Sequence, residues 1–349
     1  MRHSGKLSTK YLQYVSFQCQ EATVSLFNCS RKLLILVATS SLMTACSNSD
    51  KQADLAIDVD ATMDSLVTAE WLSQHLDDAD LVVLDCTVLV EMDENGGYRI
   101  VSGRANYEGG HIPTAAFADL MGDLSDGDSP FQFAVPTPEQ FVAAISALGV
   151  GDDTRVVLYD SYNSAWAARV WWMLRWVGFD RTALLNGGLD AWTAGGRPLS
   201  TEPANRPAGK LTLALRPELI VDRDEVLASI DNDAVNIIDA LSEAQYRGEI
   251  SMYGRPGHIP GASNVPSSSL VDDAGRYRSN DELSTLFDID RNTRAITYCG
   301  GGIAASSDAF IMTRLGFKDV AVYTASLQEW AADPANPLET GPDLDRTSE

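Results

Sequence analysis

The residues with the clearest chemical potential are Cys299 and the glycines that follow it. Cys299 ends a short apolar run, residues 295–298, and precedes three glycines at 300–302 and a helical stretch that begins at Ile303. Glycines permit a tight turn that directs successive backbone N–H groups inward, and the N-terminus of a helix adds positive potential. A cysteine in such an anion-binding loop is typical of a thiolate nucleophile. Because a purely structural thiol needs no glycines around it, we favour this interpretation over a buried, inert cysteine.

The other cysteines predict neither a disulfide framework nor a metal site. Cys86 follows Asp85 at the end of an apolar run and lacks a glycine loop, which favours a structural role. The remaining three cysteines lie before residue 50, so the region that we expect to fold keeps only two. The 4 histidines are scattered and have no paired cysteines beside them, so they provide no ligand set. We therefore expect no metal at Cys299.

An internal repeat indicates how these residues are positioned. The offsets between matching segments are 154, 147, 139 and 138 residues, so the sequence predicts two copies of one domain with loops inserted into the first. Proline and glycine cluster at residues 200–218, where we expect the linker. The matching segments are residues 81–85 and 235–239, 110–116 and 257–263, 155–160 and 294–299, and the turns that end at Trp192 and Trp330.

Each copy alternates short apolar strands with helical stretches, for example at residues 138–148 and 165–176. This alternation favours an α/β domain with a parallel sheet. Ligands bind at the carboxyl ends of the strands in such sheets. Asp160 and Cys299 occupy equivalent strand ends, which makes these ends the expected site. Asp85 and Asp239, at another equivalent pair, are expected to form strand-end hydrogen bonds.

Several motifs together resemble the tandem rhodanese sulfurtransferases over residues 66–340: two α/β copies, a Gly-His-Ile-Pro segment in each, an Asn-Gly-Gly-Leu-Asp-Ala-Trp run, and a cysteine loop in the second copy only. The resemblance implies two rhodanese-like domains, each a parallel sheet flanked by helices. The first, 66–200, is an inactive copy with Asp160 at the lost cysteine position, and the second, 219–341, is catalytic. Cys299 would carry a persulfide in a six-residue loop whose other members are Gly300, Gly301, Gly302, Ile303 and Ala304.

The activity that this resemblance implies is a two-step transfer of sulfane sulfur through the Cys299 persulfide. The donor would be a small molecule, thiosulfate or 3-mercaptopyruvate, and the acceptor a thiol or cyanide, with no metal or organic cofactor. Family members that use thiosulfate often carry cations just after the cysteine, whereas those that use 3-mercaptopyruvate tend to have Cys-Gly-Ser-Gly. Gly300 and Gly301 fit neither pattern, so the donor stays open, although the absent serine slightly favours thiosulfate.

Two arginines are candidates for binding the substrate anion. Arg247 stands where the family places a substrate-binding arginine, and Arg255 lies close to it in the sequence. A guanidinium can bind a planar anion through two parallel hydrogen bonds. The alternative for Arg247 is a surface ion pair.

The histidines and tryptophans favour structural interpretations. His111 and His258 each precede Ile-Pro, even in the copy that lacks the nucleophile, so we expect them to hold a turn. The alternative is that His111 faces Cys299 across the domain interface. Four tryptophans at helical spacing favour packing in the core and between domains over ligand stacking. They are Trp166, Trp171, Trp172 and Trp176.

Two rival functions remain open at this point. A cysteine phosphatase of related architecture requires an arginine six positions after the cysteine, where this chain has Ala305. A non-catalytic, membrane-tethered module could hold sulfane sulfur or bind a partner without turnover. Turnover with a sulfur donor distinguishes the enzyme from that module, and an aryl phosphate assay tests the phosphatase.

Net charge and the N-terminal segment restrict the partners. A net charge of −23 and the lack of a basic patch argue against nucleic acid. Residues 1–46 have the layout of a signal peptide, with Arg31 and Lys32 before an apolar stretch. Cys46 follows a small residue, as in the bacterial lipoprotein box, so we expect a lipid on Cys46 and export to the periplasmic side of a membrane. The anchor would be the only membrane contact, and an ordinary signal peptide is the alternative.

Overall fold

The computed structural model describes residues 63–92 and 98–341. The predicted leader, 1–46, and the predicted lipidation site Cys46 lie outside these residues. No helix in the described ranges is long and apolar enough to cross a membrane.

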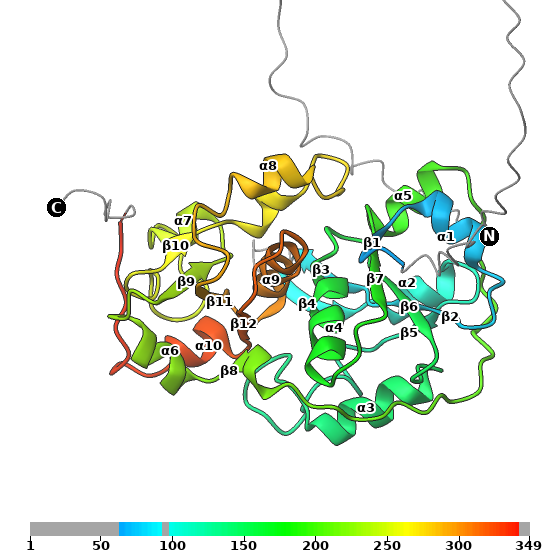
Figure 1. The fold of residues 1–349 in the computed structure, drawn as a ribbon, viewed down its shortest axis with the longest axis horizontal. Helices are drawn as coiled ribbons and strands as arrows, with labels where there is room; N and C mark the ends of the chain where they lie inside the picture. The colour runs from blue at the N-terminus through cyan, green and yellow to red at the C-terminus, as the bar shows by residue number, and fades with distance from the viewer. Residues whose placement is uncertain (1–62, 93–97, 342–349) are drawn as a thin grey trace, which may run out of the picture. The chain divides into compact units, whose positions relative to one another are not determined.

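The first half contains a five-stranded parallel sheet in the order β1-β7-β6-β2-β5 and a separate antiparallel hairpin of β3 and β4 (Figure 1). Its elements are β1 Leu66–Val67, α1 Ala69–His75, β2 Leu81–Asp85, β3 Val88–Met92, β4 Tyr98–Ser102, α2 Arg104–Gly109, β5 Ala116–Phe117, α3 Pro138–Ala147, β6 Arg155–Tyr159, α4 Ala165–Trp176, β7 Thr182–Leu185 and α5 Gly188–Ala194.

The second half contains another five-stranded parallel sheet, in the order β10-β9-β11-β12-β8. Two short 3₁₀ helices, η1 Pro217–Leu219 and η2 Ser267–Leu270, accompany it. Its other elements are β8 Ile220–Val221, α6 Arg223–Ser229, β9 Val235–Asp239, α7 Glu243–Tyr246, β10 Ser263–Asn264, α8 Asn280–Ser284, β11 Arg294–Tyr298, α9 Ile303–Arg314, β12 Val320–Tyr323 and α10 Ser326–Trp330.

The two sheets have the same topology, as the internal repeat predicts. Read from β5 to β1, the first sheet matches the second read from β10 to β8, and every pairing in both is parallel. The β3–β4 hairpin has no counterpart among the described strands of the second half. The repeat offset falls from 154 to 147 residues across this region, which predicts a loop inserted into the first copy, and the hairpin is that insertion.

Local sequence explains how the central strands and helices begin and end. All five residues of β2 are buried, which is why its first four residues are apolar without alternation. Thr137 caps α3 through a reciprocal capping box with Gln140. Asp85 and Asp239 each accept a hydrogen bond from the backbone N–H two residues later, at 2.9 and 2.8 Å, so the predicted strand-end role is confirmed.

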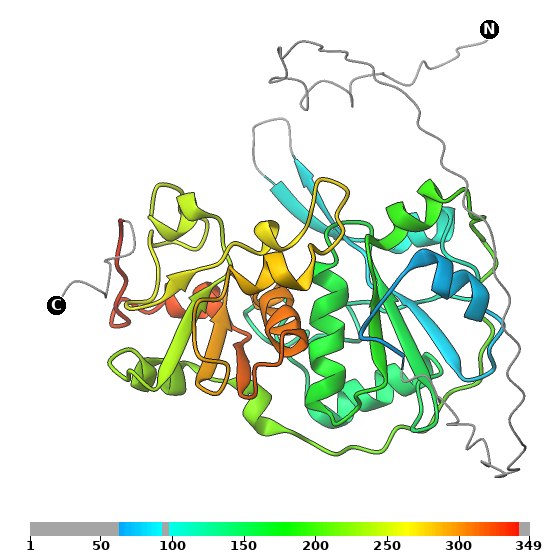
Figure 2. The same ribbon diagram turned by 45° about the horizontal axis from the view of Figure 1, so that its top comes forward.

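One apolar cluster extends through both halves and joins their central helices. The helices α4 and α9 lie side by side (Figure 2), and Trp171 of α4 meets Phe310 of α9 edge-on with ring centroids 4.9 Å apart. Trp172 and Trp176 are buried in the same cluster, which confirms the packing role predicted for them. Trp166 is also buried there but borders a pocket, described below. The cluster therefore fixes the two strand ends that carry Asp160 and Cys299.

Candidate active site

Cys299 lies between the end of β11 and the start of α9, as the glycine pattern predicts. Its side chain is only 2% exposed, and it lies at the edge of a pocket of about 990 Å³. The backbone N–H of Gly302 donates a hydrogen bond to Sγ at 3.1 Å. The sulfur thus sits beside the N-terminus of a twelve-residue helix, where positive potential stabilises an anion.

The short helix α10 holds the Cys299 loop from behind. The backbone N–H groups of Leu327 and Gln328 donate to the carbonyl oxygens of Cys299 and Gly300, both at 3.0 Å. The N–H of Cys299 itself donates to the hydroxyl of Ser326 at 3.1 Å. Ser326 is fully buried and adopts a left-handed backbone with φ 54°. These bonds satisfy the carbonyl oxygens of Cys299 and Gly300, while the Gly302 N–H bonds to Sγ. The sequence did not predict this support from α10.

Two of the three loop glycines are required by close contacts. A Cβ atom on Gly300 would lie 1.8 Å from the phenolic oxygen of Tyr253, so a side chain at residue 300 requires the Tyr253 ring to move. Gly302 has φ +79°, and its Cβ would lie 2.6 Å from the carbonyl oxygen of Thr324. A Cβ on Gly301 would meet only the flexible side chain of Gln328, at 3.1 Å. The Tyr253 ring therefore occupies the space that a side chain at residue 300 would need.

Arg169, a residue that the sequence analysis did not single out, reaches the Cys299 loop from the first half. It belongs to α4 and is fully buried, and its Nη1 lies 3.0 Å from where a Gly302 Cβ would be. Nη2 donates to the carbonyl oxygen of Phe133 at 2.9 Å, whereas Nε and Nη1 have no acceptor among the described residues. Burial lowers the pKa of Arg169 to about 10, and the charge of Cys299 acts in the opposite direction. The guanidinium is therefore still protonated at neutral pH.

The pocket above Cys299 is built by both halves of the chain. The first half contributes the β3–β4 hairpin, the segment around Phe133 and the start of α4, whereas the second contributes the Cys299 loop and residues 240–253. Gln328 connects the two halves beside the loop. Its side chain accepts from the N–H of Gln132 at 3.1 Å and donates to the carbonyl oxygen of the same residue at 2.9 Å. A molecule that fills this pocket would thus contact both halves.

The two arginines that we expected to bind the substrate anion do not line this pocket. Arg247 forms an ion pair with Glu243 at 3.0 Å on an exposed surface, which is the alternative interpretation of that residue. Arg255 donates to four backbone carbonyl oxygens in residues 330–336, so its guanidinium organises a loop. Gln245, two residues before Arg247, is the α7 residue that borders the pocket. A one-turn helix directs neighbouring side chains to different faces, and the sequence did not reveal which face meets the pocket.

The histidines of the repeated motif hold turns, as predicted. His111 is fully buried, and its ring nitrogens lie 2.7 and 3.0 Å from the carbonyl oxygens of Tyr107 and Glu202. His258 contacts the carbonyl oxygen of Tyr246 at 2.8 Å in the same way. Because both nitrogens of His111 are engaged with backbone carbonyls, His111 does not face Cys299, and the alternative interpretation is wrong.

Cys86 lies in a different environment from Cys299. It is fully buried in the apolar core, and burial raises its pKa well above the ordinary range. A protonated, inaccessible thiol is not nucleophilic. The structural role predicted for Cys86 therefore agrees with its position.

The equivalent loop of the first half is occupied by its own carboxylate. Asp160 is fully buried and accepts backbone hydrogen bonds from Tyr162, Ser164 and Ala167 at 2.9, 3.1 and 2.9 Å. The anion-binding loop of this copy is thus filled internally.

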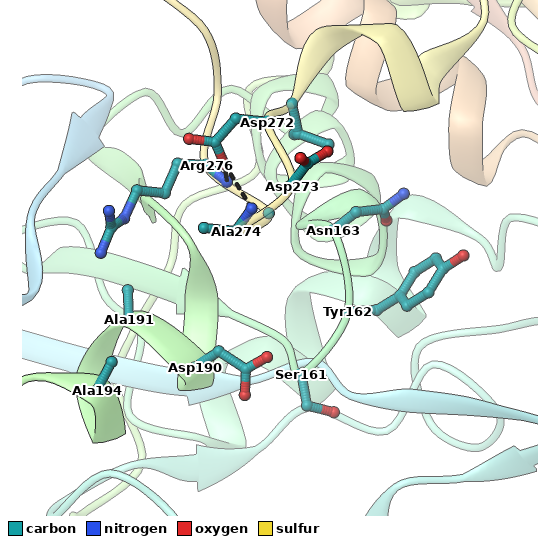
Figure 3. Close-up of a pocket in the computed structure, with 12 residues that line it drawn as sticks. Ser161, Tyr162, Asn163, Asp190, Ala191, Ala194, Asp272, Asp273, Ala274 and Arg276 are labelled. Atoms are coloured by element: carbon teal, nitrogen blue, oxygen red, sulfur yellow. Dashed lines mark hydrogen bonds between the residues drawn. The ribbon is translucent and has the colours of Figure 1, made fainter. Parts of the chain in front are cut away.

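A second pocket, of about 410 Å³, borders the loop and includes Asp190 and Asp272 (Figure 3). No group of histidine, cysteine and acidic residues suited to a metal ion occurs within residues 63–92 and 98–341.

Comparisons with known proteins agree with the repeat and the fold. The model of the rhodanese-like domain matches residues 68–195 and 222–333. The chain is 34% identical to 3-mercaptopyruvate sulfurtransferase of Escherichia coli over 279 residues, covering 78% of this chain and 97% of that protein. It is 32% identical to thiosulfate/3-mercaptopyruvate sulfurtransferase 2 of Arabidopsis thaliana, covering 84% and 91%. The crystal structure of SseA from Escherichia coli, described under the rhodanese fold of 3-mercaptopyruvate sulfotransferases, matches with a TM-score of 0.67 and 33% identity, covering 75% and 98%.

Proposed function

Because the chain belongs to the rhodanese family, with two rhodanese-like domains, we propose that it is a sulfurtransferase in which Cys299 carries the sulfur. It moves a sulfane sulfur from thiosulfate or 3-mercaptopyruvate to a thiol or cyanide. The observation that carries the proposal is the 3.1 Å hydrogen bond from the Gly302 N–H to Sγ of Cys299, at the N-terminus of α9 and at the edge of the large pocket. This arrangement stabilises a thiolate and then a persulfide anion.

The proposed reaction has two steps. The Cys299 thiolate attacks the sulfane sulfur of thiosulfate, a new S–S bond forms, and the donor S–S bond breaks with its electron pair leaving on sulfite. With 3-mercaptopyruvate the C–S bond breaks instead, and pyruvate leaves after the carbon takes up a proton. An acceptor thiolate then attacks the outer sulfur of the persulfide, which returns the Cys299 thiolate. The Gly302 N–H and the buried Arg169 charge support the anion in both steps.

The rival functions gain less support from the site. The position that a cysteine phosphatase needs for its arginine holds Ala305, which is buried inside α9. A non-catalytic module would not need both an accessible pocket and an anion-binding loop around one thiol. The relatives named above are sulfurtransferases, which also favours turnover.

The proposal is tested with the full chain by two measurements. We expect thiocyanate formation from cyanide with thiosulfate, with 3-mercaptopyruvate or with both, and a gain of one sulfur atom on the peptide that contains Cys299. Mass spectrometry after donor treatment without acceptor measures that gain. If neither donor loads sulfur onto the folded protein, the non-catalytic module becomes the better description.

We also propose that Cys46 carries a lipid and holds the chain at the periplasmic side of a bacterial membrane. The apolar stretch after Arg31 and Lys32 and the small residue before Cys46 support this. In a bacterial host fed a clickable fatty acid, the wild-type chain is expected to take up the label and sediment with membranes. The Cys46→Ser chain should do neither. Equal labelling of both chains would contradict lipidation at Cys46.

A further inference from the structure

The described residues that line the pocket above Cys299 include no lysine, arginine, histidine, aspartate or glutamate. Apart from Cys299, its polar side chains are hydroxyl and amide groups, such as those of Ser242, Gln245 and Gln328. An anionic substrate group entering this pocket would lose water and find no side-chain cation among these residues. Desolvating an unpaired carboxylate costs several kcal/mol in proteins, so the pocket walls away from the loop disfavour a charged acceptor body. The small donor anions differ because their charge lies close to the Gly302 N–H and the Arg169 charge at the reacting sulfur.

The mouth of the pocket is apolar as well as uncharged. Eight large hydrophobic side chains are strongly exposed within the described part of the chain, and half of them border this one pocket. These four are Val90, Tyr162, Ile250 and Met252, which are 52, 66, 50 and 43% exposed. Exposed apolar side chains that gather around one opening mark a binding surface, whereas scattered ones do not.

The inner wall adds an aromatic surface. Phe133 and Trp166 pack against each other with ring centroids 5.1 Å apart, and both border the pocket. They belong to the first half, whereas the Cys299 loop that lines the same pocket belongs to the second. A volume of about 990 Å³ lies at the upper end of the range for small-molecule sites and far exceeds what cyanide or a short thiol needs.

The guanidiniums of Arg169, Arg247 and Arg255 do not line the pocket. Arg247 is paired at the surface, and Arg255 is bound to backbone carbonyls. Arg169 lies fully buried on the protein side of the loop, next to Gly302, where it acts on the sulfur without meeting the substrate body. The Arg169 charge therefore acts near the reacting sulfur, whereas the pocket walls that would contact the rest of a substrate are uncharged.

We propose that the acceptor is an uncharged thiol with a bulky apolar body, such as an aryl or long alkyl group. This inference rests on the proposed sulfurtransferase function. The acceptor thiolate attacks the outer sulfur of the Cys299 persulfide. A new S–S bond forms, the bond to Cys299 breaks with its electron pair on Sγ, and the product is the hydropersulfide of the apolar acceptor. The apolar body lies against Phe133, Trp166 and the exposed rim while the two sulfur atoms exchange.

A matched pair of thiols tests the preference. Benzyl mercaptan and 4-(mercaptomethyl)benzoate share the ring and the reacting group and differ by one carboxylate. Full-length protein is first loaded from thiosulfate or 3-mercaptopyruvate, and discharge of the persulfide by each thiol is followed in a single turnover by mass spectrometry. We expect benzyl mercaptan to discharge it at least about tenfold faster. Equal rates, a faster carboxylate, or discharge by cyanide but by neither thiol would overturn the inference.

Binding provides a readout that does not depend on sulfur loading. Cys299→Ser protein is titrated calorimetrically with benzyl methyl sulfide and with 4-(methylthiomethyl)benzoate, which cannot react. The neutral thioether is expected to bind at least about tenfold more tightly. No binding of the neutral compound, or tighter binding of the carboxylate, would refute the assignment of the pocket. If the full-length protein did not load sulfur but Cys299→Ser still bound the neutral thioether more tightly, only the proposed sulfurtransferase function would be refuted.

A charge placed on the rim should change the preference in a predictable direction. Met252→Lys puts a cation at the mouth of the pocket. It is expected to lower the ratio of the discharge rate with benzyl mercaptan to that with 4-(mercaptomethyl)benzoate about tenfold. Leu227→Lys is the matched control, since Leu227 is 45% exposed on α6 and does not border the pocket. It should leave the ratio of the two rates unchanged. An equal change in both variants would mean that overall charge, and not this pocket, sets the preference.

Discussion

Replacing Cys299 by serine is expected to abolish sulfur loading and to lower turnover with either donor by at least about 10³-fold. A hydroxyl is a far weaker nucleophile than a thiolate and cannot form a persulfide. Sγ of Cys299 accepts a hydrogen bond from the Gly302 N–H, and a serine oxygen can accept the same bond. The fold should therefore survive, and thiocyanate formation by Cys299→Ser isolates the chemistry.

The matched control for this variant is Cys86→Ala. Cys86 is buried in the apolar cluster and distant in sequence from the loop, so its removal is expected to leave turnover unchanged. The deleted sulfur should lower stability by no more than about 1 to 2 kcal/mol. If Cys299→Ser kept turnover while Cys86→Ala lost it, the assignment of the sulfur carrier would be reversed. Thermal unfolding of both variants shows that differences in activity are not differences in folding.

The fold and the position of the nucleophile could be predicted because both depend on local patterns. A buried parallel strand requires a short apolar run, and the same runs recur at a nearly constant offset, so two sheets of equal topology follow. The left-handed backbone at Gly302 and its close approach to the Thr324 carbonyl oxygen likewise favour glycine, which makes the loop after Cys299 visible in the sequence. Helix bounds were predicted closely for α3 and α4 because a capping box and an extended apolar pattern mark them.

The rest of the site could not be predicted because it depends on contacts between distant segments. Ser326 lies 27 residues after Cys299 and resembles an ordinary helix-start serine, yet it accepts the Cys299 N–H. The sequence placed Arg247 near a substrate, but the orientation of a four-residue helix directs it to Glu243. Arg169 lies in a run of alanine and tryptophan that indicates a packed helix. Its neighbouring residues do not reveal that its guanidinium lies beside Gly302 of the second half.

Replacing Arg169 by methionine is expected to lower kcat/KM for sulfur transfer about 10²-fold, equivalent to about 3 kcal/mol. The guanidinium is a buried cation beside Gly302 of the Cys299 loop, and an interaction of this size with the thiolate is reasonable at an intermediate effective dielectric. Loss of the cation also disfavours the thiolate, so the rising limb of the pH profile of turnover should move to higher pH. Alkylation of Cys299 by iodoacetamide at pH 7 should slow in parallel.

Stability distinguishes this electrostatic role from a structural one. Arg169 has one hydrogen-bond acceptor, and its other buried donors have none among the described residues, so methionine removes an incompletely paired buried charge. Such replacements are often neutral or stabilising, and the melting temperature of Arg169→Met should not fall with its activity. Arg175→Met, on the same helix but paired with Asp180, should keep activity. A parallel fall of activity and stability in Arg169→Met would make Arg169 a packing residue, whereas an unchanged pH profile would mean that its charge does not act on the sulfur.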